Sequence, residues 1–413
     1  MMKHLDTLSL HEALQLAMES AIPKQEKETV LLNKALGRVL ASDVFASKNL
    51  PSFDNSAMDG FAFKANEKGK KLQVQRTIFA GEVPEASLNE GECYRIMTGA
   101  QLPSDVDTVI PMEDCIEVTD EYAVIPDSIT RGSNFRKKGE EVSAGEKLFT
   151  SGMIITASDI ALLSAQGIMA VEVYCTLEIA VVSTGNEIKE PWQAANEDEI
   201  YNANAFGIQA LLASFGFEAH YVGAIPDDLD ETVTFIAGLK RYDVVITTGG
   251  ISQGDADFLY DAFVSNGLDP LFHGINLKPG RAVMMGRMDE TFVMAMPGNP
   301  LTTMLTVHTI SLPVLYRLSG TVACYHQPFY AKMGQALRLK AGRTTIVIGE
   351  LKAGVFTPTR DNKIGSGMLL PLCESNAVAY FSESVSDIEK ESLIQVVSLQ
   401  NRTREVKNRT INL

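Results

Sequence analysis

Residues 51–61 concentrate side chains that could do chemistry, because two carboxylates, Asp54 and Asp59, stand there with an amide and a hydroxyl. Pro51 opens the run and Gly60 closes it, so we expect a loop rather than one face of a helix. An isolated Asp-Asn-Ser would more often form a turn in which the side chains bond their own backbone. The length of this polar run favours a functional loop.

The composition indicates a folded, acidic protein. A chain of 413 residues with 45% hydrophobic residues can form two to four domains at about 150 residues each. The net charge of −16 argues against a nucleic-acid partner, because such proteins carry a basic field. An acidic protein that binds a small anion must gather its cations locally. Two clusters qualify, one at Arg136, Lys137 and Lys138 and the other at Lys278 and Arg281.

Nothing in the sequence suggests export or insertion into a membrane. The N-terminal residues form no apolar run of signal-peptide type, and no window approaches the ~18 apolar residues that a span requires. The five cysteines show no Cys-x-x-Cys spacing, which argues against a disulfide framework and a zinc site. We therefore expect a cytoplasmic protein without membrane contact.

The first part of the chain predicts helices on either side of a β region. A capping box at Ser9 starts one helix, and a second helical pattern covers about 27–42. Residues 72–150 show short alternating runs broken by glycine and proline, which is typical of a small β domain. A further helix is expected over 156–167, with Ser158 as its N-cap.

Residues 175–320 give the clearest architecture. Buried-strand runs alternate with amphipathic helices in βαβαβ order, which predicts a parallel sheet with helices on both faces. Ligands bind such sheets beyond the carboxyl ends of the strands. At one such end, Gly249 and Gly250 would let backbone N–H groups approach phosphate oxygens. A plain strand-to-helix turn is an equally good interpretation of these two glycines.

Acidic residues stand at several separate points, among them Asp59, Glu187, Asp228 and Asp257. Two or three of them on one rim would suit Mg²⁺, a hard cation that takes oxygen ligands and is often shared with substrate phosphates. For Asp228, a turn and helix N-cap after Pro226 is at least as good an interpretation. Neither a P-loop nor a dinucleotide-binding fingerprint occurs in the chain.

Five motifs, in this order and spacing, carry a resemblance to a known family. They are Pro-x-Phe-Asp-Asn-Ser-Ala-Met-Asp-Gly (51–60), Ser-Thr-Gly-Asn-Glu (183–187), Thr-Gly-Gly-Ile-Ser-x-Gly-Asp-x-Asp (248–257), Lys-Pro-Gly (278–280) and Pro-Gly-Asn-Pro (297–300). Over residues 1 to about 320 the chain resembles the molybdopterin molybdotransferases, the MoeA and gephyrin E-domain group. The resemblance implies insertion of molybdate into adenylylated molybdopterin with release of AMP, assisted by Mg²⁺.

The resemblance also implies an elongated homodimer of multidomain α/β and β subunits, with a possible transient contact to a molybdopterin adenylyltransferase. We expect a three-layer α/β domain with a mostly parallel sheet, similar to the molybdopterin adenylyltransferase fold, at 176–322. The other expected domains are an elongated, partly helical N-terminal domain (1–45 plus 145–175), a small mostly β domain (46–144) and a C-terminal β-barrel-like domain (323–413).

Carried over by position, the resemblance assigns roles to individual residues. Catalytic roles fall to Asp59, Glu187, Asp228, Lys278 and Arg281, and metal contacts to Asp59, Glu187, Asp228 and Asp257. Substrate- or cofactor-binding residues would be Thr98, Gly249, Gly250, Ser252, Asp257, Pro297, Gly298, Asn299 and Pro300. Cations would neutralise charge as the phosphoanhydride breaks, and carboxylates would place Mg²⁺ against its oxygens.

The chain departs from the family pattern at a few positions. Arg281 and Ala282 stand where Lys-Pro is usual, so a planar guanidinium replaces a point charge. Three other readings stay open: a paralogue that binds the cofactor or a nucleotide without turnover, a nucleotide pyrophosphatase that needs no oxyanion, and insertion of tungstate instead of molybdate. Retention of nearly every acidic position favours an enzyme over a binding protein.

Overall fold

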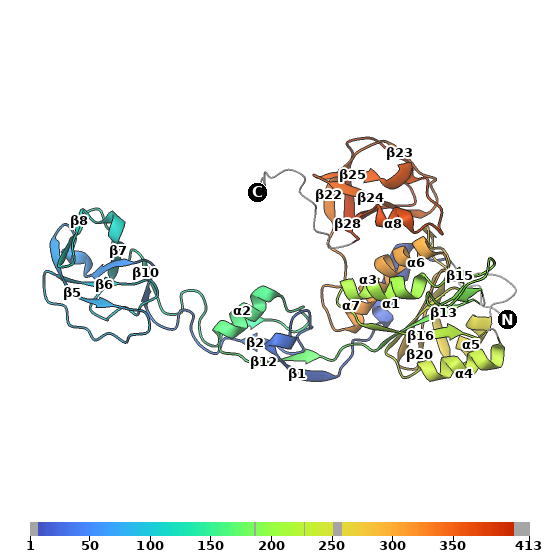
Figure 1. The fold of residues 1–413 in the computed structure, drawn as a ribbon, viewed down its shortest axis with the longest axis horizontal. Coiled ribbons are helices and arrows are strands. Elements are labelled where there is room, and N and C mark those ends of the chain that lie inside the picture. The colour runs from blue at the N-terminus through green and yellow to red at the C-terminus, as the bar shows by residue number, and fades with distance from the viewer. Residues whose placement is uncertain (1–6, 186, 227, 251–257, 400–413) are drawn as a thin grey trace.

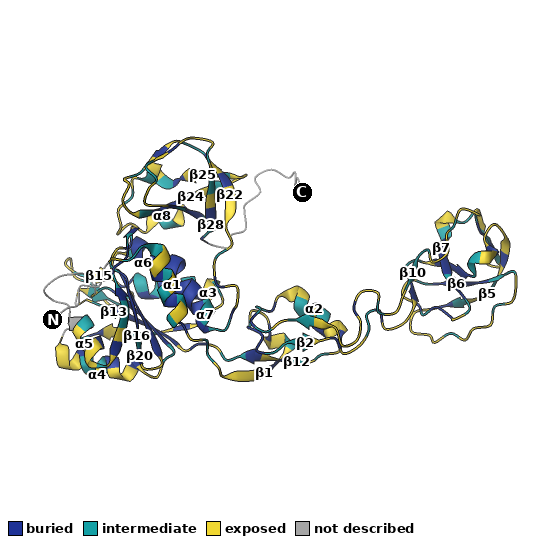
Figure 2. Cartoon of the chain, turned by 180° about the vertical axis from the view of Figure 1, so that it is seen from behind, coloured by how far each residue is buried: buried dark blue, intermediate teal, exposed yellow. Residues whose placement is uncertain are grey.

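The molecule is elongated, with a slender arm projecting from a larger body (Figure 1). The computed structural model describes residues 7–185, 187–226, 228–250 and 258–399. We call residues 22–176 the arm; the body consists of an α/β region and a β-barrel. Buried residues gather along the central sheet of the α/β region and in smaller, separate cores in the arm (Figure 2).

The first helix, α1 (Leu10–Ser20), starts at the expected capping box. The hydroxyl of Ser9 accepts from the Glu12 N–H at 3.2 Å, and the Glu12 carboxylate accepts from the Ser9 N–H at 2.8 Å. Ala13 and Ala17 are fully buried in the core of the α/β region, because small side chains let the helix approach closely. Although α1 falls within the 1–45 segment expected for the elongated domain, it packs on the body.

The middle of the arm contains two small antiparallel sheets. Their strands are β1 (Lys27–Leu31) with β12 (Ala170–Tyr174), and β2 (Val44–Phe45) with β11 (Lys147–Phe149). The prediction of a helix over 27–42 is wrong. The segment instead bonds a strand far along the chain and then turns through a 3₁₀ segment at Leu32–Lys34 and a left-handed Gly37, with φ of 76°. These long-range hydrogen bonds outweigh a local helical pattern.

The predicted helix near residue 156 is present as α2 (Ala157–Ala165). Its N-cap is Thr156 rather than Ser158, because Thr156 forms a capping box with Asp159. The Asp159 carboxylate accepts from the Thr156 N–H at 2.7 Å. The start of the helix is therefore two residues earlier than expected.

The end of the arm is a β domain, as expected for residues 72–150. Its six-stranded sheet has the order β7-β4-β6-β5-β9-β8. The strands are β4 (Gly60–Phe63), β5 (Lys71–Ile78), β6 (Glu92–Ile96), β7 (Thr108–Pro111), β8 (Glu117–Val118) and β9 (Tyr122–Val124), with β3 (Asn55–Ser56) paired to β10 (Phe135–Arg136) beside them. Within the polar run 51–61, Gly60 allows close strand pairing: a Cβ there would lie 1.9 Å from the Ile110 carbonyl oxygen.

The α/β region has the expected three layers around a mostly parallel sheet of order β16-β13-β17-β21-β20-β18. Strands β13, β16, β17 and β21 run parallel, whereas β18 and β20 are antiparallel to their neighbours. The strands are β13 (Ile179–Thr184), β16 (Ala219–Ile225), β17 (Val244–Thr248), β18 (Leu268–His273), β20 (Met284–Met288) and β21 (Thr291–Met296), and β14 (Ile188–Lys189) and β15 (Ile200–Tyr201) form a small separate pair.

Helices cover both faces of this sheet, each with its own hydrophobic core. On one face lie α1, α3 (Asn204–Ser214), α6 (Pro300–Thr306) and α7 (Leu312–Leu318), and on the other α4 (Leu229–Leu239) and α5 (Phe258–Ser265). A π-helical turn, Val307–Ser311, joins α6 to α7. Residues 300–318 therefore form one helical run with this one irregular turn.

The C-terminal region is a closed five-stranded barrel, because β24 pairs with β25 on one side and with β26 on the other. Its strands are β22 (Phe329–Met333), β24 (Thr344–Lys352), β25 (Val355–Pro358), β26 (Ala377–Phe381) and β28 (Leu393–Ser398), with the β23 (Leu337–Arg338) and β27 (Asp387–Ile388) pair and α8 (Leu370–Cys373). A short strand of the α/β region, β19 (Leu277–Lys278), extends this sheet by pairing with β24. The predicted multidomain α/β and β fold is confirmed.

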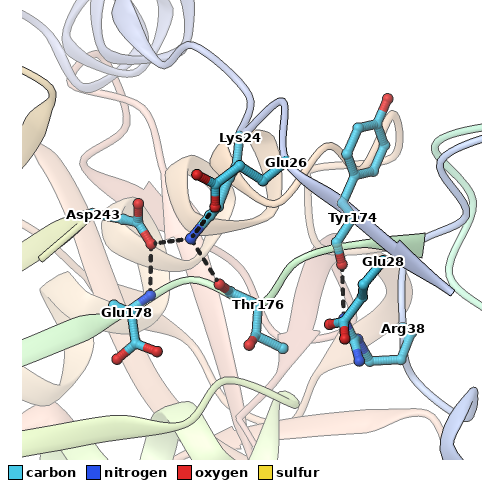
Figure 3. Close-up of polar contacts among 8 residues, drawn as sticks. All are labelled: Lys24, Glu26, Glu28, Arg38, Tyr174, Thr176, Glu178 and Asp243. Carbon is cyan, nitrogen blue, oxygen red and sulfur yellow. Dashed lines mark hydrogen bonds and ion pairs between the residues drawn. The ribbon is translucent and has the colours of Figure 1, made fainter. Parts of the chain in front are cut away.

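Two chain segments join the arm to the body, and the ion pair between Lys24 and Asp243 is hydrogen-bonded to the backbone where they meet (Figure 3). The Lys24 ammonium lies 2.8 Å from the Asp243 carboxylate and donates to the Thr176 carbonyl at 3.2 Å. Asp243 also accepts from the Glu178 N–H at 2.7 Å. Lys24 belongs to the segment that enters the arm, Thr176 and Glu178 to the segment that leaves it, and Asp243 directly precedes the central strand β17.

Within the described part of the chain, no helix is long and apolar enough to cross a bilayer.

Candidate active site

A pocket of about 600 Å³ opens at the carboxyl edge of the α/β sheet. Parallel strands bring their carboxyl ends to one edge, so the segments that follow β13, β17 and β21 all meet there. Their residues in the pocket wall are Thr184, Gly185, Glu187, Thr248, Gly249, Gly250, Pro297, Gly298, Asn299 and Pro300. The pocket thus gathers seven of the residues that the sequence assigned to the site: Glu187, Gly249, Gly250, Pro297, Gly298, Asn299 and Pro300.

Gly249 and Gly250 form a turn that other residues could adopt only with strain. Their φ angles are 88° and 69°, in the left-handed region that favours glycine. A Cβ on Gly249 would lie 2.5 Å from the Thr184 hydroxyl, and one on Gly250 would lie 3.1 Å from it. The N–H of Gly249 already donates to the Met296 carbonyl at 3.0 Å. This glycine therefore contributes close approach rather than a free hydrogen-bond donor.

The turn from Pro297 to Pro300 closes the pocket on the side of β21. The strand ends at Met296, because Pro297 has no backbone N–H to continue the ladder. Pro300 is the first residue of α6, a position that proline favours. Asn299 is the N-cap residue of α6 and lines the pocket, and its side chain makes no capping hydrogen bond.

The predicted acids of the α/β region have different surroundings. Glu187 is exposed in the pocket wall, and its carboxylate lies so close to Gly185 that a Cβ there would be 2.7 Å from Oε2. Asp228 caps α4, since its Oδ1 accepts from the N–H groups of Asp230 and Glu231 at 3.0 Å each. Asp228 is not among the residues that line the pocket.

Asp59 and Thr98 lie together at the end of the arm. The Asp59 Oδ1 accepts from the Thr98 N–H at 2.6 Å and from the Thr98 hydroxyl at 2.8 Å. The backbone bond and, after it, the hydroxyl bond hold the pKa of Asp59 below its usual range, because both stabilise the carboxylate. The chain thus fixes one ionised acid on an exposed loop of the β domain, which Figure 1 shows at the opposite end of the molecule from the α/β region.

The predicted cations also lie outside the pocket wall. Lys278 lines a second cavity, of about 300 Å³, between the α/β region and the barrel. Hydroxyl and amide side chains of Thr345, Asn362 and Ser366 line the same cavity. Arg281 is exposed, and it is the next residue, Ala282, that borders the main pocket.

Two predicted residues, Ser252 and Asp257, lie outside the described residues. Among the residues that are described, no three of the His, Cys, Asp and Glu side chains gather as a metal site would require. Glu187 is the carboxylate that the described pocket wall offers to a cation. Mg²⁺ commonly uses one or two carboxylates and completes its shell with water and substrate phosphates, so this donor set fits a metal that arrives with its substrate.

Comparison with known proteins identifies the family. Residues 8–167 match the MoeA N-terminal region (domains I and II), and residues 180–317 match the probable molybdopterin-binding domain. The chain is 32% identical to a molybdopterin molybdenumtransferase of Haemophilus influenzae over 316 residues, covering 76% of this chain and 78% of the relative. The chain belongs to the MoeA family.

The MoeA likeness extends over nearly the whole chain. A molybdopterin molybdenumtransferase of Staphylococcus epidermidis is 28% identical over 414 residues, covering 96% of this chain and 97% of the relative. A crystal structure of a molybdopterin biosynthesis MoeA protein from Pyrococcus horikoshii matches with a TM-score of 0.81 at 26% identity. That match covers 95% of this chain and all of the other. The resemblance inferred from the five motifs is confirmed.

This MoeA-family pocket also contains residues that the motifs did not single out. Ile200 and Tyr201 add exposed apolar surface to its wall, and Asn204 stands between two of its loops. The sequence held one signal for Asn204, an amide close to the start of one of the amphipathic helices expected within 175–320. Such residues usually cap the helix, so the pattern alone did not indicate a contact with the loops.

Proposed function

We propose that this protein inserts molybdate into adenylylated molybdopterin and releases AMP, as a step of molybdenum cofactor biosynthesis. The observation that carries the proposal is the pocket at the sheet edge, which is large enough for a nucleotide-bearing ligand and is bordered by two left-handed glycines. The similarity to relatives named molybdopterin molybdenumtransferase supports the same reaction.

The residues of the pocket suit an anionic, partly aromatic ligand. Gly249 and Gly250 let phosphate oxygens approach the backbone, while Ile200 and Tyr201 offer apolar surface for a ring system. Thr184 and Thr248 also line the pocket, next to the glycine turn. Substrate phosphates and rings would thus meet different walls, which fixes the orientation of the phosphoanhydride that breaks.

Mg²⁺ fits this site as a companion of the substrate. Glu187 would hold it at the rim, and Asp59, Asp228 and Asp257 remain candidate ligands. A bound Mg²⁺ stabilises negative charge on phosphate oxygens. Glu187 would help to hold the cation at the pocket wall.

We propose that the protein forms a homodimer, because its two groups of site residues lie far apart within one chain. Asp59 and Thr98 stand next to β4 and β6, in the β domain that Figure 1 shows at the opposite end of the molecule from the α/β region. The pocket with Glu187 and Gly249 belongs to the α/β region. A second copy can bring the end of its arm to this pocket, and two-fold symmetry would then complete two equal sites. We propose that each active site combines the pocket of one subunit with Asp59 and Thr98 of the other.

Lys278 would act from the neighbouring cavity. Its ammonium, together with the nearby hydroxyl and amide groups, suits an anionic group of the substrates, and Arg281 adds positive charge on the exposed loop. We further propose a cytoplasmic location and a transient contact with the adenylyltransferase that supplies the substrate. A nucleic-acid partner is not expected for a chain with net charge −16.

The decisive experiment measures AMP release from adenylylated molybdopterin by the purified protein with Mg²⁺, with and without molybdate. Release that requires molybdate and yields metal-loaded cofactor is the expected result. Release that is indifferent to molybdate would instead indicate a pyrophosphatase, and tight binding without release would indicate a non-catalytic paralogue. Repeating the assay with tungstate tests which oxyanion is preferred.

A further inference from the structure

Asn204, the first residue of α3, contacts two pocket loops at once. Its Nδ2 donates to the Thr248 hydroxyl at 2.6 Å and to the Gly298 carbonyl at 2.8 Å. Thr248 is the last residue of β17, and Gly298 lies in the turn after β21. A single side-chain amide therefore ties together the loops that form two walls of the pocket.

The helix does not need Asn204 for its own start. The oxygen Oδ1 of Asn202 accepts from the Ala205 N–H at 3.1 Å and serves the first turn of α3. The corresponding oxygen of Asn204 is buried and has no hydrogen-bond partner among the described residues. A buried polar atom without a partner costs stability, so the side chain sits here at a cost to the local fold. That cost is consistent with a role in the pocket.

The orientation of the Asn204 amide is fixed by chemistry. The Gly298 carbonyl can only accept, so the NH₂ group must face it. The two loops that it joins are already in close contact, since a Cβ on Gly298 would lie 3.4 Å from the Cα of Gly249. A carboxylate in place of the amide would keep the shape but turn the bond to the Gly298 carbonyl into a contact between two acceptors, whereas the Thr248 hydroxyl could rotate and donate to the carboxylate.

We propose that Asn204 is a positioning residue that sets the spacing between the glycine turn at Gly249 and the turn at Gly298, and so shapes the part of the pocket that receives the nucleotide phosphate. The proposal rests on the proposed function for the identity of the ligand. The two hydrogen bonds that Asn204 donates do not depend on that function.

The test compares Asn204→Asp with a matched control, Asn266→Asp. Asn266 also donates its Nδ2 to two acceptors, the carbonyls of Val233 and Ala262 at 3.0 and 2.9 Å, in the same α/β region but away from the pocket wall. Calorimetric titration of the full-length variants with AMP should show affinity at least about tenfold weaker for Asn204→Asp and within about twofold of wild type for Asn266→Asp. Their melting temperatures should fall by similar amounts.

A second measurement keeps the proposal independent of the nucleotide. Amide hydrogen exchange without ligand should become faster in peptides covering 244–250 and 296–300 of Asn204→Asp, and should be unchanged there in Asn266→Asp. Unchanged exchange in Asn204→Asp would overturn the proposal, as would an equal loss of AMP affinity in both variants. If wild-type protein neither binds nor releases AMP, the proposed function fails, and the exchange result still decides the role of Asn204.

Discussion

The pocket and the end of the arm build their parts of the site in different ways. At the pocket, the shape comes from backbone: two left-handed glycines and a proline-bounded turn meet at the sheet edge. At the end of the arm, the important element is one side chain, Asp59, held as a carboxylate by Thr98. The function of the pocket therefore depends on its shape, whereas the contribution of the arm depends on the charge of Asp59. Substitutions at the two places should therefore impair activity in different ways.

The largest effect is expected at the end of the arm. Asp59→Asn removes the charge from an exposed side chain, so turnover should fall about 100-fold or more while the melting temperature stays unchanged. AMP release measured beside thermal unfolding checks both. Wild-type turnover in Asp59→Asn would remove Asp59 from the site.

Mixed dimers sharpen the same test. Equal amounts of Asp59→Asn and Glu187→Ala protein, unfolded and refolded together, should recover about a quarter of wild-type turnover, because half of the dimers then contain one intact site. Each variant refolded alone serves as the control. No recovery in the mixture would contradict an active site shared between subunits.

A smaller loss is expected from Gly249→Ala, which changes shape rather than charge. The added Cβ would meet the Thr184 hydroxyl at 2.5 Å and would also impose φ strain, so activity should fall about 10- to 100-fold. Gly267→Ala is the matched control, since Gly267 has nearly the same φ, 87°, with open space around it. Gly267→Ala should lose about 1–2 kcal/mol of unfolding free energy from the φ strain alone, and Gly249→Ala should lose more because of the added contact, both measured by urea denaturation. Equal activities would show that the glycine turn is only structural.

Thr98→Val tests the charge at the end of the arm more gently. In the folded protein the pKa of Asp59 is lowered, first by the Thr98 N–H and then by its hydroxyl. Asp59 therefore stays ionised to lower pH than an ordinary aspartate and loses its charge only as the pH falls through the lowered pKa. Removing the hydroxyl leaves the backbone bond, so the acid limb of the kcat/KM profile should move part of the way to higher pH. An unmoved acid limb would mean that another group titrates there.

The smallest expected effect separates two interpretations of Asp228. Asp228→Ala removes the N-cap of α4 and should cost about 1 kcal/mol of unfolding free energy, whereas Asp228→Asn keeps a capping oxygen and should cost little. Urea denaturation measures both. A residue that only caps the helix would leave Asp228→Asn with full turnover, while a loss of turnover in this variant would assign the carboxylate to the active site.

Sequence patterns correctly predicted the helices and strands that are determined by residues close together in the chain. The capping box at Ser9 and the alternation of strands and helices after residue 175 both follow from neighbouring residues. The helix predicted over 27–42 was wrong because its hydrogen-bond partner, β12, lies far along the chain. Long-range pairing of this kind leaves no signal in a local pattern.

The candidate site was predictable to a similar extent. Motif glycines and prolines marked the pocket walls, because these residue types are required by backbone geometry that neighbouring residues reveal. The separation of Asp59 from Glu187 within one chain was not predictable, since it depends on the length and direction of the arm. Nor was the link made by Asn204, because its two partners come from loops that meet only in the folded sheet.

The arm interrupts the chain of the body. The arm leaves the body after α1 and returns just before β13, and its two ends run side by side, with the Cys175 N–H donating to the Glu26 carbonyl at 2.9 Å. In topology the arm is therefore an insertion within the α/β region. That region contains α1, which precedes the arm in the chain, and the strands and helices that follow the arm. Because the two ends already lie side by side, replacing the arm by a short hairpin turn would test whether the body folds on its own.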